Sequence, residues 1–225
     1  FSFDIKNPIC ETKNGEITTT VTSGTEPYSF SWIHISPMQM SDFEKGLTNE
    51  LYSNIIIFND KGYGGTTNTD ESGIANDGAL GTEQSIIIKA SSISKNLTND
   101  YAGFYTYIGS EISSLANFVE GISFYHKGEG IVFRAFGDNM FEKLIPAHEE
   151  WTLVTFYFDE GLAPNDFYWT YRGANNYQSE MQFQIDEINL LIRYPSDVTT
   201  KDQNELSAGT YNLKVTDSYG CTYTD

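Results

Sequence analysis

The stretch MQFQIDEINLLIRY, residues 181–194, is the strongest strand pattern in this sequence, and the prediction of the fold starts from it. Its β-branched and aromatic side chains are typical of a strand inside a packed sheet. Asp186 lies within this apolar run, where an ionised carboxylate must be paired, hydrogen-bonded or bound to a cation. We therefore predict a long central strand that carries one carboxylate with a partner elsewhere in the chain.

The two ends of the chain share a pattern that the middle lacks. Residues 2–35 alternate apolar and polar side chains and are broken by turn residues at Asn14-Gly15 and at GTEP, residues 24–27. Residues 205–223 alternate in the same way. Neither end has enough strands to bury a core, but together they make about five, the scale of a small immunoglobulin-like sandwich. We therefore predict a discontinuous domain, residues 1–35 and 201–225, with residues 36–200 inserted into it.

The inserted segment reads as all-β, because its apolar runs are short, β-branched or aromatic, and bounded by Gly, Asn or Asp. About eight strands in this length match a two-sheet jelly-roll β-sandwich. Residues 159–180 are predicted to be a long loop that contains Trp169. The predicted strands are residues 42–44, 54–59, 84–90, 101–108, 119–126, 131–136, 151–158 and 181–192.

Composition and charge limit the function. With 39% hydrophobic and 15% aromatic residues, the 225-residue chain can bury a real core. Thirty-one acidic against thirteen basic residues give a net charge of −18, which opposes nucleic-acid binding. The sequence has no apolar run long enough to insert into a membrane. It begins at Phe1 rather than Met, so we expect one module of a larger multidomain protein.

The chain has two cysteines, Cys10 and Cys221, one near each end. In a chain rich in Ser, Thr, Asn and Gly, this pair suggests one disulfide that ties the termini together. Two buried free thiols are the alternative.

The end segments resemble the SprB-type repeat of surface adhesins from gliding bacteria. The resemblance rests on the order of Cys10, NGEI at 14–17, GTEPY at 24–28, Trp32, LSAGTY at 206–211, VTD at 215–217 and Cys221. About 170 residues separate Trp32 from LSAGTY, far more than in the family. The resemblance implies a secreted or bacterial cell-surface location.

The inserted segment resembles the jelly-roll carbohydrate-binding modules appended to plant-polysaccharide hydrolases. The motifs are SDFE at 41–44, FNDKG at 58–62, GISFYHKGEG at 121–130, EWTLVTF at 150–156 and FQIDEI at 183–188. The resemblance implies a structural Ca²⁺ beside the first and last strands, with Glu44 and Asp186 at the acidic positions and Asp42 and Asp60 as nearby candidates. Alternatively, Asp186 accepts backbone N–H bonds and Glu44 is solvated.

Sugars bind such modules through aromatic rings that lie against the pyranose face, with polar groups at the rim. If Phe124, Phe133 and Phe156 point into the core, alternation sends their strand neighbours to the other face. The predicted ligand-binding residues are Tyr105, Tyr107, Tyr125, Arg134, Phe136, Tyr157 and, from the loop, Trp169.

Catalysis is not indicated. The three histidines have no metal-ligand spacing, and no nucleophile or phosphate-loop motif is present. We therefore expect non-catalytic binding of a polysaccharide, with β-glucan or xylan as the first guess. A structural adhesin or spacer repeat without glycan binding is the alternative, and a glycoside hydrolase is the third interpretation.

Overall fold

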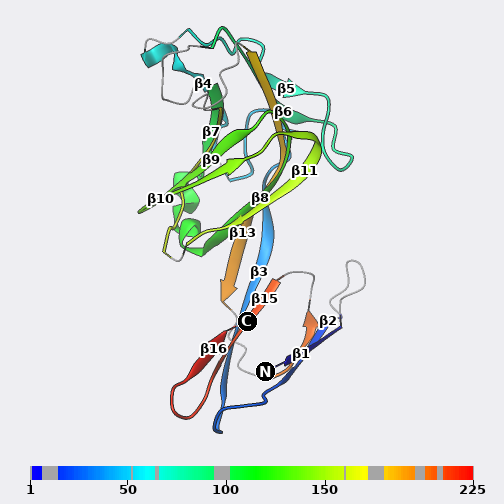
Figure 1. Ribbon diagram of the computed structural model, residues 1–225, viewed down its shortest axis with the longest axis vertical. Helices are drawn as coiled ribbons and strands as arrows, with labels where there is room; N and C mark the ends of the chain where they lie inside the picture. The colour runs from blue at the N-terminus through cyan, green and yellow to red at the C-terminus, as the bar shows by residue number, and fades with distance from the viewer. Residues whose placement is uncertain are drawn as a thin grey trace. The chain divides into compact units, whose positions relative to one another are not determined.

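The computed structural model describes residues 2–6, 15–51, 53–63, 66–93, 102–159, 161–171, 180–195, 201–206 and 210–224. The described residues are predominantly β-strands with two short 3₁₀ helices, which confirms the all-β prediction. The elements are β1 Ser2–Lys6, β2 Gly15–Thr20, β3 Ser29–Ser41, β4 Ile56–Asn59, η1 Asp60–Tyr63, β5 Gly73–Ala75, β6 Ser85–Ser91, β7 Ala102–Tyr107, η2 Ser110–Phe118, β8 Val119–Gly128, β9 Ile131–Phe136, β10 Met140–Ile145, β11 His148–Tyr157, β12 Asp166–Tyr171, β13 Glu180–Pro195, β14 Gln203–Leu206, β15 Thr210–Thr216 and β16 Thr222–Thr224 (Figure 1).

The chain divides into two compact units. One consists of Phe1–Pro37 and Ile192–Asp225, and the other of Met38–Leu191. Strands β3 and β13 each contribute residues to both units, so the boundaries fall inside strands rather than in loops. Among the described helices, none combines the length and the apolar character needed to cross a membrane.

The smaller unit is a β-sandwich with its own core. β2 pairs antiparallel with β1 and with β14, while β15 pairs antiparallel with β3 and β16. Strict alternation in β2 buries every second side chain, including Ile17. Ile17 packs with Trp32, Leu213 and Val215, which come from β3 and β15. The turn-bounded alternation of the two chain ends therefore builds one hydrophobic core.

The larger unit contains a five-stranded sheet in the order β10-β9-β12-β7-β4. A second sheet contains β11, β8 and β13, with β6 and β5 beside the first half of β13. Aromatic side chains join the two sheets: the rings of Phe124 on β8 and Phe133 on β9 lie 5.6 Å apart, and Phe156 on β11 stacks on Phe133 at 5.8 Å. This arrangement is the two-sheet sandwich predicted for the inserted segment.

Two local predictions were wrong, and β10 was missed. Residues 159–180 are not one long loop, because they contain β12, which pairs with both β7 and β9. Residues 42–44 do not form a strand; β3 ends at Ser41, and Phe43 turns the chain with a φ of 62° while its ring is buried. β10 was not predicted, because its apolar and charged residues do not alternate; it lies at the edge of the sheet, where Met140 and Leu144 are exposed.

The predicted disulfide stays a prediction. Cys221 is an exposed free thiol just before β16. Cys10 lies outside the described residues.

Candidate functional site

One row of side chains crosses the five-stranded sheet from edge to edge. In register, Glu142 on β10 lies opposite Arg134 on β9, Arg134 opposite Tyr168 on β12, Tyr168 opposite Tyr105 on β7, and Tyr105 opposite Ile56 on β4. Directly paired residues share a sheet face. The core is lined instead by their neighbours Phe133, Trp169 and Phe104, so this row lies on the outward face.

Aromatic rings on this outward face form one contiguous group. Tyr105 and Tyr168 stack with centroids 5.0 Å apart, and Phe58 contacts them at 6.2 and 6.4 Å. The ring of Phe136 meets Tyr168 edge-on at 5.2 Å. All four rings are half-buried and therefore keep part of their surface open. We call Phe58, Tyr105, Phe136 and Tyr168 the aromatic face.

Polar groups lie beside the aromatic face. Arg134 is only 5% exposed, and its Nε donates to Glu142 Oε2 at 2.6 Å, which fixes the guanidinium next to Tyr168. Asp166 pairs in register with Phe136 and Tyr107, and burial raises the pKa of its carboxyl. Burial, with Asp166 and Tyr105 nearby, also raises the pKa of the Tyr168 phenol. The face therefore combines rings with a fixed cation and a carboxylate acceptor.

The structure brings together only part of the predicted ligand-binding set. Tyr105, Arg134 and Phe136 lie on the outward face of the five-stranded sheet, with Tyr107 on the same side of β7 as Tyr105. Tyr125 and Tyr157 belong to β8 and β11 of the other sheet. Since Phe124 and Phe156 on the same strands face the core, these two tyrosines lie on the outward side of that other sheet.

The prediction for Trp169 was wrong. This residue lies in β12 rather than in a loop, and its side chain is 0% exposed. Its ring stacks on Phe104 at 4.7 Å and contacts Phe133 at 5.2 Å inside the core. Its neighbour Tyr168 is the ring that faces outward, and sequence reasoning missed it together with Phe58. Once β12 is recognised as a strand, alternation alone would have found Tyr168.

Two of the four acidic residues predicted to bind calcium, Asp186 and Glu44, accept hydrogen bonds from residues 79–84. Asp60 instead lies buried at the start of η1, where it accepts from the backbone N of Thr67 at 3.0 Å. The carboxylate of Asp186 is completely buried and accepts from the backbone N of Ala79 at 2.7 Å, the hydroxyl of Thr82 at 2.6 Å and the backbone N of Glu187 at 2.8 Å. Oε1 of Glu44 accepts from two backbone N–H groups at 2.7 and 2.9 Å. The partners of Asp186 expected from the sequence are thus found, and in this structure they are N–H and O–H donors.

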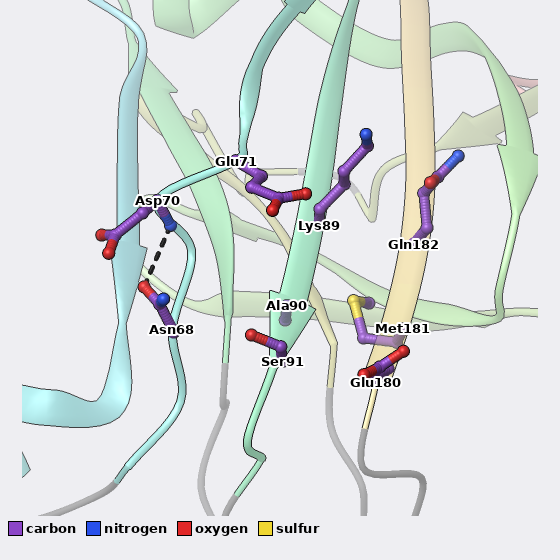
Figure 2. Close-up of a pocket in the computed structure, with 9 residues that line it drawn as sticks. All are labelled: Asn68, Asp70, Glu71, Lys89, Ala90, Ser91, Glu180, Met181 and Gln182. Atoms are coloured by element: carbon purple, nitrogen blue, oxygen red, sulfur yellow. Dashed lines mark hydrogen bonds between the residues drawn. The ribbon is translucent and has the colours of Figure 1, made fainter.

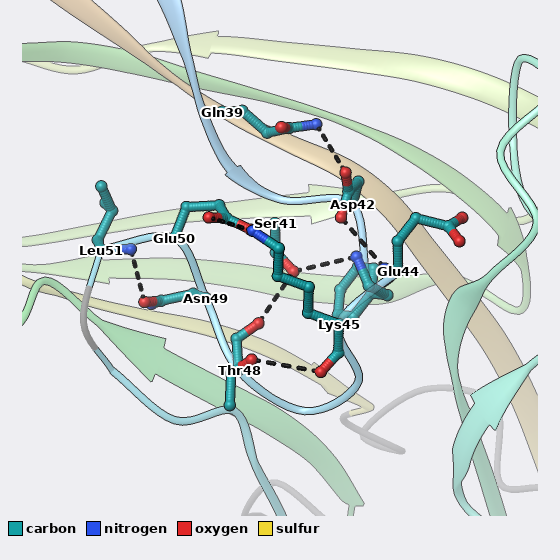
Figure 3. A network of polar contacts seen from close by, with 10 residues as sticks. Gln39, Ser41, Asp42, Glu44, Lys45, Thr48, Asn49, Glu50 and Leu51 are labelled. Atoms are coloured by element: carbon teal, nitrogen blue, oxygen red, sulfur yellow. Dashed lines mark hydrogen bonds and ion pairs between the residues drawn. The ribbon is translucent and has the colours of Figure 1, made fainter.

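Negative charge is crowded around Asp186. Figure 3 shows Asp42 near Glu44, with Gln39 Nε2 donating to Asp42 Oδ2 at 3.3 Å. Burial raises the pKa of Asp186, and repulsion from Asp42 adds to the effect. Burial and then repulsion from Asp186 and Asp42 raise the pKa of Glu187. The described residues contain no group of three metal-ligating side chains, so a cation here would need backbone carbonyls as further ligands.

A pocket of about 670 Å³ lies elsewhere in the larger unit, beside β6 and the first residues of β13 (Figure 2). Lys89 and Gln182 are paired in register across these two strands. The lining residues described are Asn68, Asp70, Glu71, Lys89, Ala90, Ser91, Glu180, Met181 and Gln182. None of these carries an aromatic ring, so the pocket lacks the stacking surface that the five-stranded sheet provides.

Residues 2–36 match the family model described as the SprB repeat. The match confirms the predicted resemblance for the segment that contains β1, β2 and the first part of β3. No curated protein matches the chain.

Solved structures that resemble the chain have low sequence identity. Two are mutants of a family 29 carbohydrate-binding module, in which a lysine or an aspartate is replaced by alanine. The lysine mutant is 16% identical with a TM-score of 0.36, and the match covers 61% of this chain and 90% of that one. The aspartate mutant is 13% identical with a TM-score of 0.35, and the match covers 62% of this chain and 89% of that one. A cleaved adhesin domain of Lys-gingipain is 11% identical with a TM-score of 0.39, covering 69% of this chain and 99% of its own. The candidate site is therefore defined by the residues of this chain alone.

Proposed function

We propose that the unit Met38–Leu191 binds a polysaccharide without catalysing its cleavage, and that it does so through the aromatic face. The observation that carries this proposal is the contiguous group of half-buried rings beside Arg134 and Asp166. A pyranose ring offers an apolar C–H face and a rim of hydroxyls. Stacked tyrosines suit the former, while a fixed guanidinium and a carboxylate suit the latter.

The dimensions of the face support binding along a polysaccharide chain. The row from Glu142 to Ile56 crosses five strands. Adjacent strands lie about 4.8 Å apart, so the row is about 19 Å long, enough for several sugar units. Hydroxyl–protein bonds replace hydroxyl–water bonds with little net gain, so we expect a Kd in the micromolar to millimolar range. β-Glucan and xylan remain the first ligands to test.

We propose further that the chain is a module of a larger secreted or cell-surface protein that it anchors to the polysaccharide. The match of residues 2–36 to the SprB repeat supports this placement. The net charge of −18 is compatible with a neutral glycan and opposes nucleic acid as a partner.

Replacing Tyr168 with alanine is expected to weaken polysaccharide binding by about 1–3 kcal/mol, or about 5- to 150-fold in Kd, because the ring stacks at the centre of the aromatic face. Calorimetric titration with soluble β-glucan, xylan and their oligosaccharides measures the change. Tyr157→Ala is the matched control, since this tyrosine is 53% exposed but lies in the other sheet.

Unchanged affinity in Tyr168→Ala would contradict the assignment of the site. Loss of affinity only in Tyr157→Ala or Tyr125→Ala would move the site to the outward side of β8 and β11. A wild-type chain that binds no polysaccharide would favour the spacer function, and release of reducing sugar would favour a hydrolase.

We also propose one structural Ca²⁺ beside Glu44 and Asp186. Burial raises the pKa values of Asp186 and Glu187, and repulsion from nearby carboxylates, including Asp42, adds to the effect. A cation beside these groups would favour their ionised forms, which supports the proposal. At free calcium about a hundredfold above Kd, the ion would add about 2.7 kcal/mol to the free energy of unfolding. We expect chelator to lower the melting temperature of the wild type and Glu44→Gln to reduce this response. An equal response in both proteins would argue against this site.

A further inference from the structure

Asp166 carries a carboxylate without a charged partner beside the aromatic face. The residue is half-buried and pairs in register with Phe136 on β9 and Tyr107 on β7. In the part of the chain that the structure describes, no hydrogen bond or ion pair reaches this carboxylate. Burial raises the pKa of Asp166, and among the described residues no cation acts against that effect. A ligand that brings positive charge to this place would therefore offset the cost of desolvation.

The carboxylate lies on the same side of β12 as the central ring of the site. Phe167 and Trp169 are 0% exposed and face the core, so Asp166 and Tyr168 both face outward. Two residues along a strand are about 6.8 Å apart. The charge of Asp166 also contributes to the raised pKa of the Tyr168 phenol, as expected of close neighbours. A substituent on a sugar that stacks on Tyr168 can therefore reach the carboxylate.

Three aromatic rings surround this carboxylate. Tyr107 and Phe136 flank Asp166 on the two neighbouring strands, and Tyr168 follows it on β12. The ring of Phe136 meets that of Tyr168 edge-on at 5.2 Å. The faces of such rings attract cations. Carboxylate and rings together thus favour a positively charged group over a neutral hydroxyl, which gains only the hydrogen bond.

The other charged side chains of this sheet face cancel each other. On the described strands β4, β7, β9, β10 and β12, the outward positions carry only Arg134, Glu142 and Asp166 as charged residues. Arg134 Nε donates to Glu142 Oε2 at 2.6 Å. Because this pair is neutral as a whole, the charge of Asp166 remains as the excess, and Arg134 does not repel a cation strongly.

The turns at the same end of the sheet bring no positive charge. They are residues 108–110, 137–139 and 161–165, all of which the structure describes. Their one charged side chain is Asp138, which is another carboxylate. Negative charge beside Tyr168 is therefore a property of this whole end of the five-stranded sheet.

We propose that the aromatic face selects polysaccharides whose sugars carry an ammonium group, and that Asp166 determines this specificity. The inference rests on the proposed function and names the class of sugar for the same site. The sugar ring stacks on Tyr168, while its ammonium group donates to Asp166 and lies against the neighbouring rings. Charge-assisted hydrogen bonds are stronger than neutral ones, so a polymer with hydroxyls alone binds more weakly.

The test uses three oligosaccharides of equal length and the same linkage, built from glucose, from N-acetylglucosamine and from glucosamine. They differ in one substituent, which is a hydroxyl, an acetamide or an ammonium group. Calorimetric titration of the full chain is carried out at a pH at which the amines are protonated. The glucosamine oligomer is expected to bind on the order of tenfold more tightly than the other two. Added salt should reduce this preference, because it screens the ion pair.

Two substitutions decide whether the preference belongs to Asp166. Asp166→Asn is expected to weaken binding of the glucosamine oligomer about tenfold or more and that of the glucose oligomer less, because the amide oxygen still accepts from a hydroxyl. Glu149→Gln removes the same charge from an exposed position on β11 of the other sheet and should keep the preference. Melting temperatures check folding, and Asp166→Ser serves if Asp166→Asn fails to fold.

Failure of this inference is distinguishable from failure of the proposed function. Equal affinity for the glucose and glucosamine oligomers, or a preference that survives in Asp166→Asn, overturns the inference but leaves polysaccharide binding in place. Absence of binding by all three oligomers overturns both. A lysine peptide of equal charge that competes as well as the glucosamine oligomer would show recognition of ammonium groups without sugar, and would also overturn the inference.

Discussion

Replacing Trp169 with alanine is expected to lower the free energy of unfolding by about 3–5 kcal/mol. The indole is completely buried, stacks on Phe104 at 4.7 Å and contacts Phe133 and Phe124 at 5.2 and 5.6 Å. These rings come from both sheets of the larger unit, so the cavity left by alanine would lie where the sheets meet. Urea unfolding followed by far-ultraviolet circular dichroism measures the loss.

Two tyrosine positions give this experiment its controls. Tyr157→Ala removes a ring that is 53% exposed and should change stability by no more than about 0.5 kcal/mol. Tyr168→Ala, one residue before Trp169, should reduce sugar binding far more than it reduces stability. A Trp169→Ala protein that unfolds like the wild type would place the indole outside the core and return it to the list of candidate ligand-binding residues.

Acid is expected to lower the free energy of unfolding through protonation of His126. This side chain is 0% exposed, and burial followed by the proximity of His148 lowers its pKa to about 4 from 6.5. Its Nε2 lies 3.0 Å from the carbonyl of Glu129, which can only accept, so Nε2 carries the proton. Nδ1 of His126 is therefore the acceptor for Nδ1–H of His148 at 2.8 Å.

The direction of the pH effect follows from proton uptake on unfolding. The unfolded chain binds a proton at His126 below about pH 6.5, whereas the folded chain resists it until about pH 4. The stability contributed by the neutral imidazole is therefore complete above pH 6.5 and is lost as the pH falls towards 4. A difference of about 2.5 pH units corresponds to about 3 kcal/mol.

Urea unfolding of the wild type and of His126→Gln tests the prediction. The pH is varied from about 7.5 to about 4, which spans the range between the two pKa values of His126. Many carboxylates also titrate at the acid end, so the informative quantity is the difference between the two pH profiles. Glutamine can donate to the Glu129 carbonyl without titrating, so the variant should lose less stability on acidification. Parallel profiles would show that His126 is not the responsible group.

Strand existence was predictable wherever β-branched and aromatic residues were dense. The stretch at 181–192 appears as part of β13, and Asp186 within it has the hydrogen-bond partners that its burial demands. The sequence could not show that these partners are Ala79 and Thr82, because more than a hundred residues separate them from Asp186. β12 was missed because Gly161, Pro164 and Asn165 precede it and favour a loop.

Half of the candidate site was predictable for a similar reason. Alternation along β7 and β9 correctly placed Tyr105, Arg134 and Phe136 on an outward face. The same argument correctly placed Tyr125 and Tyr157 on an outward face, but that face belongs to the other sheet. Alternation along one strand cannot show which of the two sheets the strand joins. That depends on strand order, which brings β12 between β9 and β7 and so sets Tyr168 beside Tyr105.

The ion pair between Arg134 and Glu142 bears on which glycans the proposed site would accept. Glu142 already neutralises the positive charge of Arg134, and Asp166 adds a further carboxylate beside Phe136. A polymer rich in uronic acids would bring more negative charge to a chain that already carries −18, whereas a neutral polymer would meet no such repulsion. Under the proposed function, we therefore expect the aromatic face to prefer neutral polysaccharides to acidic ones, with binding of neutral chains that depends little on salt concentration.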